Sequence, residues 1–180
     1  MNIPFHKTHT SEEEKDAVLD ALNSGWVTMG PKTIEFENKF KNYIGSTESI
    51  SMNSATAALH LALKAIDLKE NDEVIIPTNT FIATAEVVTY FKAIPILCDI
   101  EYSTHNIDVK KIESLITTKT KAIIPVHFAG QPCDMDEIYE IAKKYNISSE
   151  RIRQIESRSL RKLRHPSRVI KIKEFYEEEK

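Results

Sequence analysis

The sequence lacks several features that would place it in a specialised class of protein. Only two cysteines and four glycines occur among 180 residues, which excludes a disulfide-rich mini-protein and a collagen-like fibre. No apolar run reaches eighteen residues, so we expect no membrane-spanning helix. The N-terminus has no apolar core and turns acidic at residues 12–14, so we expect no signal peptide and a cytoplasmic location. Cys98 and Cys133 lack the spacing of metal ligands, and no metal site is predicted.

Arginine is also absent from most of the chain. Residues 1–147 contain fourteen lysines, no arginine and twenty-one acidic residues, which gives a net charge of −7. Residues 148–180 contain six arginines, four lysines and six glutamates, which gives a net charge of +4. Such a shift is typical of two parts with different partners, and the basic part favours a polyanion. A basic surface helix with no nucleic-acid partner is the alternative.

The composition and the pattern of hydrophobic residues predict a soluble α/β fold. Hydrophobic residues make up 41% of the chain and charged residues 28%, as in ordinary folded proteins. Short apolar segments alternate with helical patterns, which predicts a parallel sheet covered by helices on both faces. The expected strands are 49–52, 74–77, 96–99 and 122–126, and the expected helices are 12–22, 33–43, 57–63, 83–91, 108–116 and 134–145.

Residues that follow the strands are the candidates for a binding site, because ligands of parallel sheets bind at the carboxyl ends of the strands. Ser54 lies where a helix begins, and the N–H groups there favour a phosphate. The simpler interpretation of Ser54 is a helix cap. Phe81 is either a ligand contact or a core residue. Asp99 and His127 follow the next two strands, and a structural histidine fits the pattern of His127 as well as a catalytic one.

Several ordered sequence blocks carry a resemblance to one enzyme family. They are 24–31 (SGWVTMGP), 53–59 (NSATAAL), 77–85 (PTNTFIATA), 120–127 (TKAIIPVH) and 130–135 (GQPCDM). With these blocks, residues 1–147 resemble the sugar-nucleotide aminotransferases of the DegT/StrS family, which use pyridoxal phosphate. The resemblance implies an aminotransferase-type sheet and a role for seven residues. The implied cofactor contacts are Ser54, Ala55, Thr56 and Phe81, and the implied substrate loop contains Trp26, Thr28 and Gly30.

The chemistry of this family needs two further groups, which are expected beyond residue 145. One is an acid that holds the pyridinium nitrogen, and the other is the lysine that forms the Schiff base. Residues 148–153 stand where the acidic strand end is expected, and the later lysines lie in the basic tail. We therefore expect a truncated aminotransferase that is inactive alone, with no catalytic residue and weak or absent binding of pyridoxal phosphate. The complete family transfers an amino group from glutamate to a keto-sugar nucleotide, and we expect a homodimer.

The last part of the chain carries a second resemblance. Residues 150–156 (ERIRQIE) and 160–168 (LRKLRHPSR) are similar to the promoter-reading helix-turn-helix of primary bacterial sigma factors. Helix 134–145 would be the first helix of this motif, with Ala142 and Tyr145 facing inward. The resemblance implies promoter DNA and RNA polymerase as partners. The implied DNA contacts are Glu150, Arg151, Arg153, Gln154 and Arg158.

The two resemblances together predict a chimera. Residues 1–147 are expected to form a truncated aminotransferase-like α/β domain. Residues 136–180 are expected to form an all-α helix-turn-helix segment, which shares helix 134–145 with the first domain. A truncated aminotransferase-type protein, without turnover by this chain alone, is the leading prediction. A promoter-binding transcription module and a non-functional fusion fragment are the alternatives.

Overall fold

The structure, a computed structural model, describes residues 8–147. The chain divides into two compact units, Met1–Ser51 and Met52–Lys180. The predicted helix-turn-helix lies outside the described residues except for its first helix, and all five predicted DNA contacts lie outside them. Those contacts therefore stay a prediction. No helix within residues 8–147 is both long enough and apolar enough to cross a bilayer.

The first unit contains two helices, α1 (Glu12–Asn23) and α2 (Pro31–Ile44). α1 begins with a capping box. The Glu14 N–H donates to the Ser11 hydroxyl at 3.2 Å, and the Ser11 N–H donates to the Glu14 carboxylate at 2.6 Å. Pro31 opens α2, where a residue without an N–H loses no helical hydrogen bond. Neither helix has a fully buried residue in the described structure, and most of their large apolar side chains are exposed.

The second unit is built on a three-stranded parallel sheet. β1 (Glu73–Pro77) is central, β2 (Ile94–Cys98) pairs with one side of it, and β3 (Thr120–Ile123) pairs with the other. Ile75 of β1 lies opposite Ile96 of β2. β1 is almost entirely buried, as a strand covered on both faces should be. The prediction of an α/β fold with a parallel sheet is confirmed.

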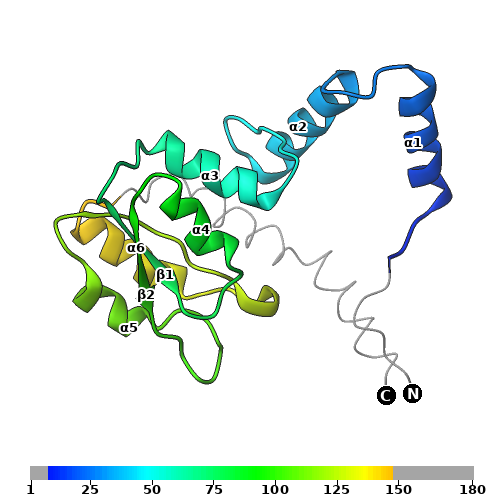
Figure 1. Ribbon diagram of the computed structural model, residues 1–180. Helices are drawn as coiled ribbons and strands as arrows, with labels where there is room; N and C mark the ends of the chain where they lie inside the picture. Colours follow the sequence, from blue (N-terminus) through cyan, green and yellow to red (C-terminus); the bar gives the residue numbers. More distant parts are fainter. Residues whose placement is uncertain (1–7, 148–180) are drawn as a thin grey trace, which may run out of the picture. The chain divides into compact units, whose positions relative to one another are not determined.

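Helices cover both faces of this sheet (Figure 1). They are α3 (Ala55–Ala65), α4 (Ala83–Thr89), α5 (Val109–Ile112), which a 3₁₀ turn (Glu113–Leu115) extends, and α6 (Met135–Lys144). Val74 and Ile76 pack with residues of α3 and α4 on one face. Ile75 packs with residues of α5 and α6 on the other. Consecutive side chains of β1 thus enter two separate hydrophobic clusters, as the two-residue period of a strand dictates.

The predicted strand at 49–52 is wrong. These residues form no strand, and Ile50 is 71% exposed. The Ser51 N–H, which a strand would use for pairing, donates to the Glu37 carboxylate at 2.7 Å. The Ser51 hydroxyl donates to the same oxygen at 2.9 Å. A segment with no buried face and an engaged N–H gains little by joining a sheet. The predicted four-stranded sheet therefore has three strands within residues 8–147.

The last described helix packs on the sheet of the second unit. Four residues of α6 are buried in the cluster that contains Ile75: Met135, Ile138, Tyr139 and Ala142. Tyr145, which the sequence predicts to face inward, is instead 40% exposed. It occupies the C-cap, where the backbone leaves the helix, and so it no longer shares the buried side of α6.

The chain turns back into the hydrophobic core directly after α6. Asn146 has a positive φ of 54°, and its N–H donates to the Lys143 carbonyl at 3.2 Å. The Ile147 N–H donates to the Ala142 carbonyl at 2.8 Å. These two hydrogen bonds form a Schellman motif, in which the residue after the left-handed position packs against the helix. Ile147 is accordingly 5% exposed and belongs to the same cluster as Ala142.

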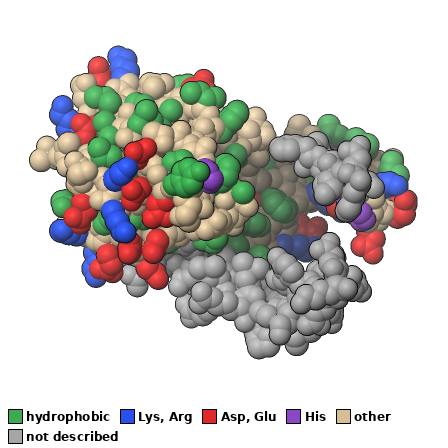
Figure 2. All heavy atoms as spheres, turned by 90° about the horizontal axis from the view of Figure 1, so that it is seen from below, with side chains coloured by type: hydrophobic (Ala, Val, Ile, Leu, Met, Phe, Trp, Pro, Cys, Tyr) green, Lys and Arg blue, Asp and Glu red, His purple; other side chains and the backbone are tan. Residues whose placement is uncertain are grey.

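The charged side chains lie on the surface. Acidic and basic side chains are interleaved over one face, with exposed hydrophobic side chains beside them (Figure 2). The pair between Lys144 of α6 and Glu113 is typical, with 2.9 Å between nitrogen and oxygen and both side chains exposed. Exposed pairs of this kind add little stability because water and salt screen them. The stability of the second unit therefore rests mainly on its two hydrophobic clusters.

Candidate functional site

The N-terminus of α3 presents hydrogen-bond donors to solvent. Ser54 is the N-cap, and its hydroxyl accepts from the Ala57 N–H at 3.1 Å. This cap leaves the N–H groups of Ala55 and Thr56 without a partner among residues 8–147, as expected for the first turn of a helix. Ser54 and Ala55 are exposed and Thr56 is half-buried, so a ligand can reach them. The helix dipole adds partial positive charge, which makes this terminus suitable for an anion.

The chain order places this terminus at the carboxyl edge of the sheet. α4 connects the parallel strands β1 and β2 and therefore runs against them. α3 leads into the start of β1, so its C-terminus is near the amino end of that strand and its N-terminus lies away from it. The two helices also pack together. The His60 ring of α3 meets the Tyr90 and Phe91 rings edge-on, with centroids 5.3 and 5.2 Å apart. Ser54, Ala55 and Thr56 therefore lie on the side of the sheet where ligands bind.

Phe81 is an exposed aromatic ring that follows β1 at the same edge. Solvent reaches 76% of its surface, so the alternative of a core residue is wrong. The turn that carries it is anchored on both sides. The Thr80 and Thr84 hydroxyls are 2.8 Å apart, and the Thr78 N–H donates to the Cys98 carbonyl at 2.9 Å. An exposed ring on an anchored turn is suited to stacking on a planar ligand.

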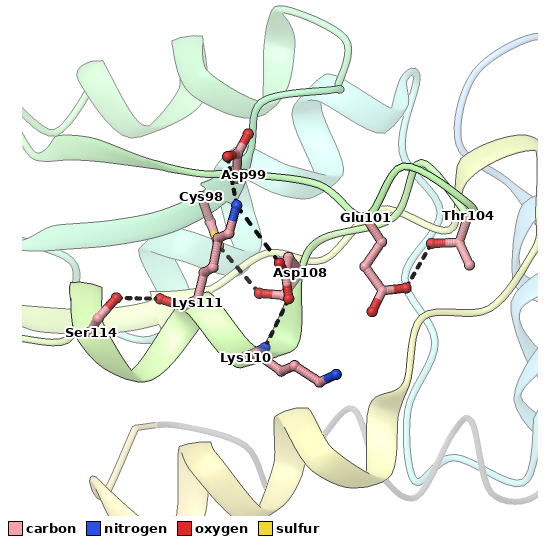
Figure 3. Close-up of polar contacts among 8 residues, drawn as sticks. All are labelled: Cys98, Asp99, Glu101, Thr104, Asp108, Lys110, Lys111 and Ser114. Atoms are coloured by element: carbon pink, nitrogen blue, oxygen red, sulfur yellow. Dashed lines mark hydrogen bonds and ion pairs between the residues drawn. The ribbon is translucent and has the colours of Figure 1, made fainter.

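Asp99, at the end of β2, is engaged by an ion pair (Figure 3). Nζ of Lys111 lies 2.8 Å from Oδ2 of Asp99 and 3.8 Å from Oδ2 of Asp108. The hydrogen bond and charge of Lys111 lower the pKa of Asp99, and the hydrogen bond to Asp99 raises the pKa of Lys111. A lysine becomes a nucleophile when its pKa is lowered, so Lys111 is unsuited to covalent catalysis.

Both cysteines are buried thiols. Cys98 is 0% exposed and Cys133 is 6% exposed. Burial, with Asp108 and Asp99 nearby, raises the pKa of Cys98 to about 11. A thiol that stays protonated is a weak nucleophile and a weak metal ligand. Residues 8–147 contain no group of three side chains that could hold a metal ion.

His127 lies in the loop between β3 and α6. Its Nδ1 accepts from the Cys133 N–H at 3.0 Å. Asn106, in the segment before α5, also holds this loop. The Asn106 residue is only 4% exposed. No local sequence pattern selects Asn106, because its partners lie 22 to 26 residues away along the chain. An asparagine in a polar turn before a helix is too common to stand out without those contacts.

The predicted substrate loop belongs to the first unit. The Trp26 indole N–H donates to the Met29 carbonyl at 2.9 Å, which closes the loop. Gly30 is buried, and a Cβ at this position would collide with the indole ring. Thr28 is exposed within the same loop. The loop is therefore preformed, and its role beside a substrate stays a prediction.

The described residues thus fit an α/β protein with a ligand site at the carboxyl edge of its parallel sheet. A helix terminus with free N–H donors and an exposed aromatic ring lie at the carboxyl edge of one parallel sheet, where they would suit an aromatic ligand that carries a phosphate. Ser54, Ala55, Thr56 and Phe81 belong to this unit, whereas the predicted loop from Trp26 to Gly30 belongs to the other.

The chain belongs to the DegT/DnrJ/EryC1/StrS aminotransferase family, whose model matches residues 8–149. A GDP-perosamine synthase from Caulobacter vibrioides is 47% identical over 135 residues, which are 74% of this chain and 36% of that protein. An uncharacterized protein from Methanocaldococcus jannaschii is 52% identical over 145 residues, which are 81% of this chain and 38% of that protein.

Solved structures support the same assignment. The PMP-form of a putative sugar aminotransferase from Streptococcus pneumoniae matches with a TM-score of 0.77 and 40% identity, over 83% of this chain and 39% of that one. The E. coli GDP-4-keto-6-deoxy-D-mannose-3-dehydratase with bound hydrated PLP matches with a TM-score of 0.76 and 28% identity, over 81% and 39%. Pyridoxal phosphate is thus the cofactor of homologous proteins. The chain spans between 36% and 39% of the length of these four relatives.

Proposed function

We propose that this chain supplies the phosphate and ring contacts of a pyridoxal-phosphate site in a sugar-nucleotide aminotransferase. The observation that carries the proposal is the α3 N-terminus, where the Ala55 and Thr56 N–H groups have no hydrogen-bond partner among residues 8–147. Two N–H donors and a helix dipole suit the cofactor phosphate, and Phe81 suits its ring. When bound, pyridoxal phosphate supplies an electron sink for amino transfer.

The names of the relatives support the substrate class. One is a GDP-perosamine synthase and another is a putative sugar aminotransferase. For the complete enzyme we propose amino transfer from glutamate to a keto-sugar nucleotide by a homodimer, with the loop that carries Trp26 and Thr28 beside the sugar. We propose that this part of the enzyme dimerises on its own. Light scattering of the purified chain tests that dimer, and a monomeric mass at micromolar concentration would contradict it.

The chain alone is proposed to hold the cofactor without covalent attachment and without turnover. Lys111 stands beside the end of β2, but its ion pair with Asp99 favours the protonated amine. Asp99 has that cation as its partner and is a poor choice to hold a pyridinium nitrogen. Borohydride reduction of the chain mixed with equimolar pyridoxal phosphate should give only low-level labelling spread over exposed lysines, with no single lysine modified preferentially by mass spectrometry. Stoichiometric modification of one lysine would show that covalent capture does occur.

Ala55→Pro tests the phosphate site at little cost to the fold. Proline is tolerated at the first helical position, and Ser54 (φ −160°, ψ 157°) has the extended backbone that suits a residue before proline. The variant lacks one N–H donor. Its Kd for pyridoxal phosphate, followed by cofactor fluorescence, should rise roughly tenfold or more, because a hydrogen bond to a charged group contributes about 1.5–3 kcal/mol.

The matched control is Glu12→Pro, at the first position of α1. It also follows an extended serine cap, Ser11, but lies in the other unit. Its Kd should equal that of the parent, and circular dichroism checks the fold of both variants. If Ala55→Pro and the parent bind pyridoxal phosphate with equal Kd, the proposed phosphate site is wrong. If the parent shows no saturable binding, the proposed function is wrong.

A second candidate function rests on the charge of residues 148–180. All six arginines follow residue 150, and the family match ends at residue 149. We propose that this basic segment contacts DNA, with Arg151 and Gln154 at base edges. The support for this second proposal is the sequence alone.

A further inference from the structure

A buried asparagine fixes the loop that follows β3. Nδ2 of Asn106 donates to the carbonyls of Gln131 and Pro132, at 3.1 and 3.2 Å. Oδ1 of Asn106 accepts from the Phe128 N–H at 2.9 Å. The side chain thus binds the loop on both sides of its turn, and it uses donors and an acceptor together. Few side chains of this size can do so, because the interaction needs a primary amide.

The loop needs such support because its turn is strained. Ala129 has a φ of 50° and Gly130 a φ of 82° inside the 3₁₀ turn Phe128–Gly130. Left-handed backbone is unfavourable for a residue with a Cβ, such as Ala129. Strained backbone persists only where its surroundings hold it, and it is concentrated at functional sites. The three hydrogen bonds of Asn106 supply that support at 4% exposure, where water competes little.

The same loop sets the state of His127. Its Nδ1 accepts from the Cys133 N–H at 3.0 Å, so a neutral ring carries its proton on Nε2. The Cys133 thiol donates to the Val126 carbonyl at 3.2 Å, which closes the base of the loop. Nε2 makes no hydrogen bond within the part of the chain that the structure describes, and His127 is exposed. The loop therefore presents one N–H donor to solvent.

We propose that Asn106 is a positioning residue, which holds loop 126–133 so that His127 donates from Nε2 to an oxygen of the anionic cofactor. The inference rests on the proposed function, because it takes pyridoxal phosphate as the ligand. β3 pairs directly with β1, so this loop leaves the sheet at the edge that also carries Phe81. A histidine that only braces the loop needs Nδ1 and makes no use of Nε2.

NMR of a chain with ¹⁵N-labelled histidine tests the donor directly. In the parent, His127 should carry its proton on Nε2 alone, and the Nε2 resonance should shift when pyridoxal phosphate is added. His127→Ala should raise the Kd for pyridoxal phosphate roughly tenfold, as expected for loss of a hydrogen bond to a charged group. The control is His105→Asn, in a neighbouring exposed turn. Asparagine tolerates the left-handed backbone of His105 (φ 58°), and this variant should bind like the parent.

Asn106→Asp tests the positioning role. It keeps the acceptor for the Phe128 N–H but directs an oxygen at the two carbonyls, so His127 should show mixed tautomers and several-fold weaker binding. If Asn106→Asp fails to fold, Asn106→Ser is the second variant, because its hydroxyl can bond only one of the three partners. It should also show mixed His127 tautomers and several-fold weaker binding of pyridoxal phosphate. A pure Nε2–H tautomer in the variant that folds would remove Asn106 from this role.

The outcomes separate this inference from the proposed function. If Ala55→Pro weakens binding of pyridoxal phosphate and His127→Ala does not, the proposed role of His127 is wrong and the phosphate site is supported. If neither variant changes the Kd, the cofactor site itself is wrong. Mixed tautomers of His127 in the parent chain would overturn the loop geometry, whatever the binding results.

Discussion

At the scale of single residues, Phe81 combines a large ring with 76% exposure. Its removal takes little from the core, so Phe81→Leu should change the free energy of unfolding by less than about 0.5 kcal/mol. Stacking on an aromatic ligand contributes about 0.5–1.5 kcal/mol, so the Kd for pyridoxal phosphate should rise roughly two- to tenfold. Fluorescence titration measures the Kd. Ile82→Ala, at a neighbour that is 67% exposed, is the control and should bind normally. An equal loss in both variants would argue against stacking.

The buried thiol of Cys98 limits stability at high pH. Its pKa is raised from 9.0 to about 11, so the folded chain holds the thiol proton more tightly than the unfolded chain. The resulting stabilisation is complete below about pH 9 and is lost as the pH rises towards 11. Urea denaturation should show the free energy of unfolding fall across this window. Cys98→Ala should be less stable at pH 8 because of its cavity, but should show a smaller fall. Parallel pH curves would assign the loss to other groups.

The site residues differ in how far the sequence alone can reveal them. Ser54 is predictable because a helix cap depends on the few residues around it, and the structure has that cap. The exposure of Phe81 is decided by the whole fold, so the sequence around Phe81 does not distinguish a core residue from a ligand contact. Asn106 and the tautomer of His127 depend on partners brought together by folding, and no local pattern contains them.

At the scale of elements, helices and buried strands were predictable because their periodicity and caps are local. The segment 49–52 shows the limit of this reasoning. Its four residues have the length and composition of a strand, but the engagement of Ser51 by Glu37 of α2 is a tertiary contact. β3 likewise ends at Ile123, before the predicted end at 126, and Pro125 lacks the N–H that would extend the ladder.

The loop between α1 and α2 is an element with its own reporter, because Trp26 is the one tryptophan of the chain. Gly30→Ala should drive the indole away from the Met29 carbonyl, since a Cβ at position 30 would occupy the space of the ring. The fluorescence emission of Trp26 should shift and its near-ultraviolet circular dichroism should weaken. Thr28→Ala removes an exposed side chain of the same loop and should leave both signals unchanged. Unchanged spectra in Gly30→Ala would show that the loop is not closed by this packing.

At the scale of the whole molecule, α6 decides how the two predicted segments relate. A helix-turn-helix that begins with α6 needs Ala142 and Ile147 to face a second helix. In the structure both side chains are already buried in the core of the α/β unit. The Schellman motif directs Ile147 into that core. A shared α6 would therefore have to lose its packing against the sheet in order to pack against a second helix. The sequence pattern of α6 fits both arrangements, so it does not reveal that they exclude each other.

The proposed DNA contact of residues 148–180 has its own signature. Binding of a fluorescent promoter duplex should weaken steeply with salt, because phosphate contacts release counterions. Arg151→Ala and Gln154→Ala should each reduce discrimination between promoter and random duplexes by about 1–3 kcal/mol. The control is Lys144→Ala, which removes a positive charge from α6, where Lys144 pairs with Glu113, and should preserve discrimination. A parent chain that binds both duplexes equally would exclude base reading. Ala55→Pro lies outside residues 148–180, so it should change cofactor binding and leave DNA binding intact, and the two proposed functions can fail independently.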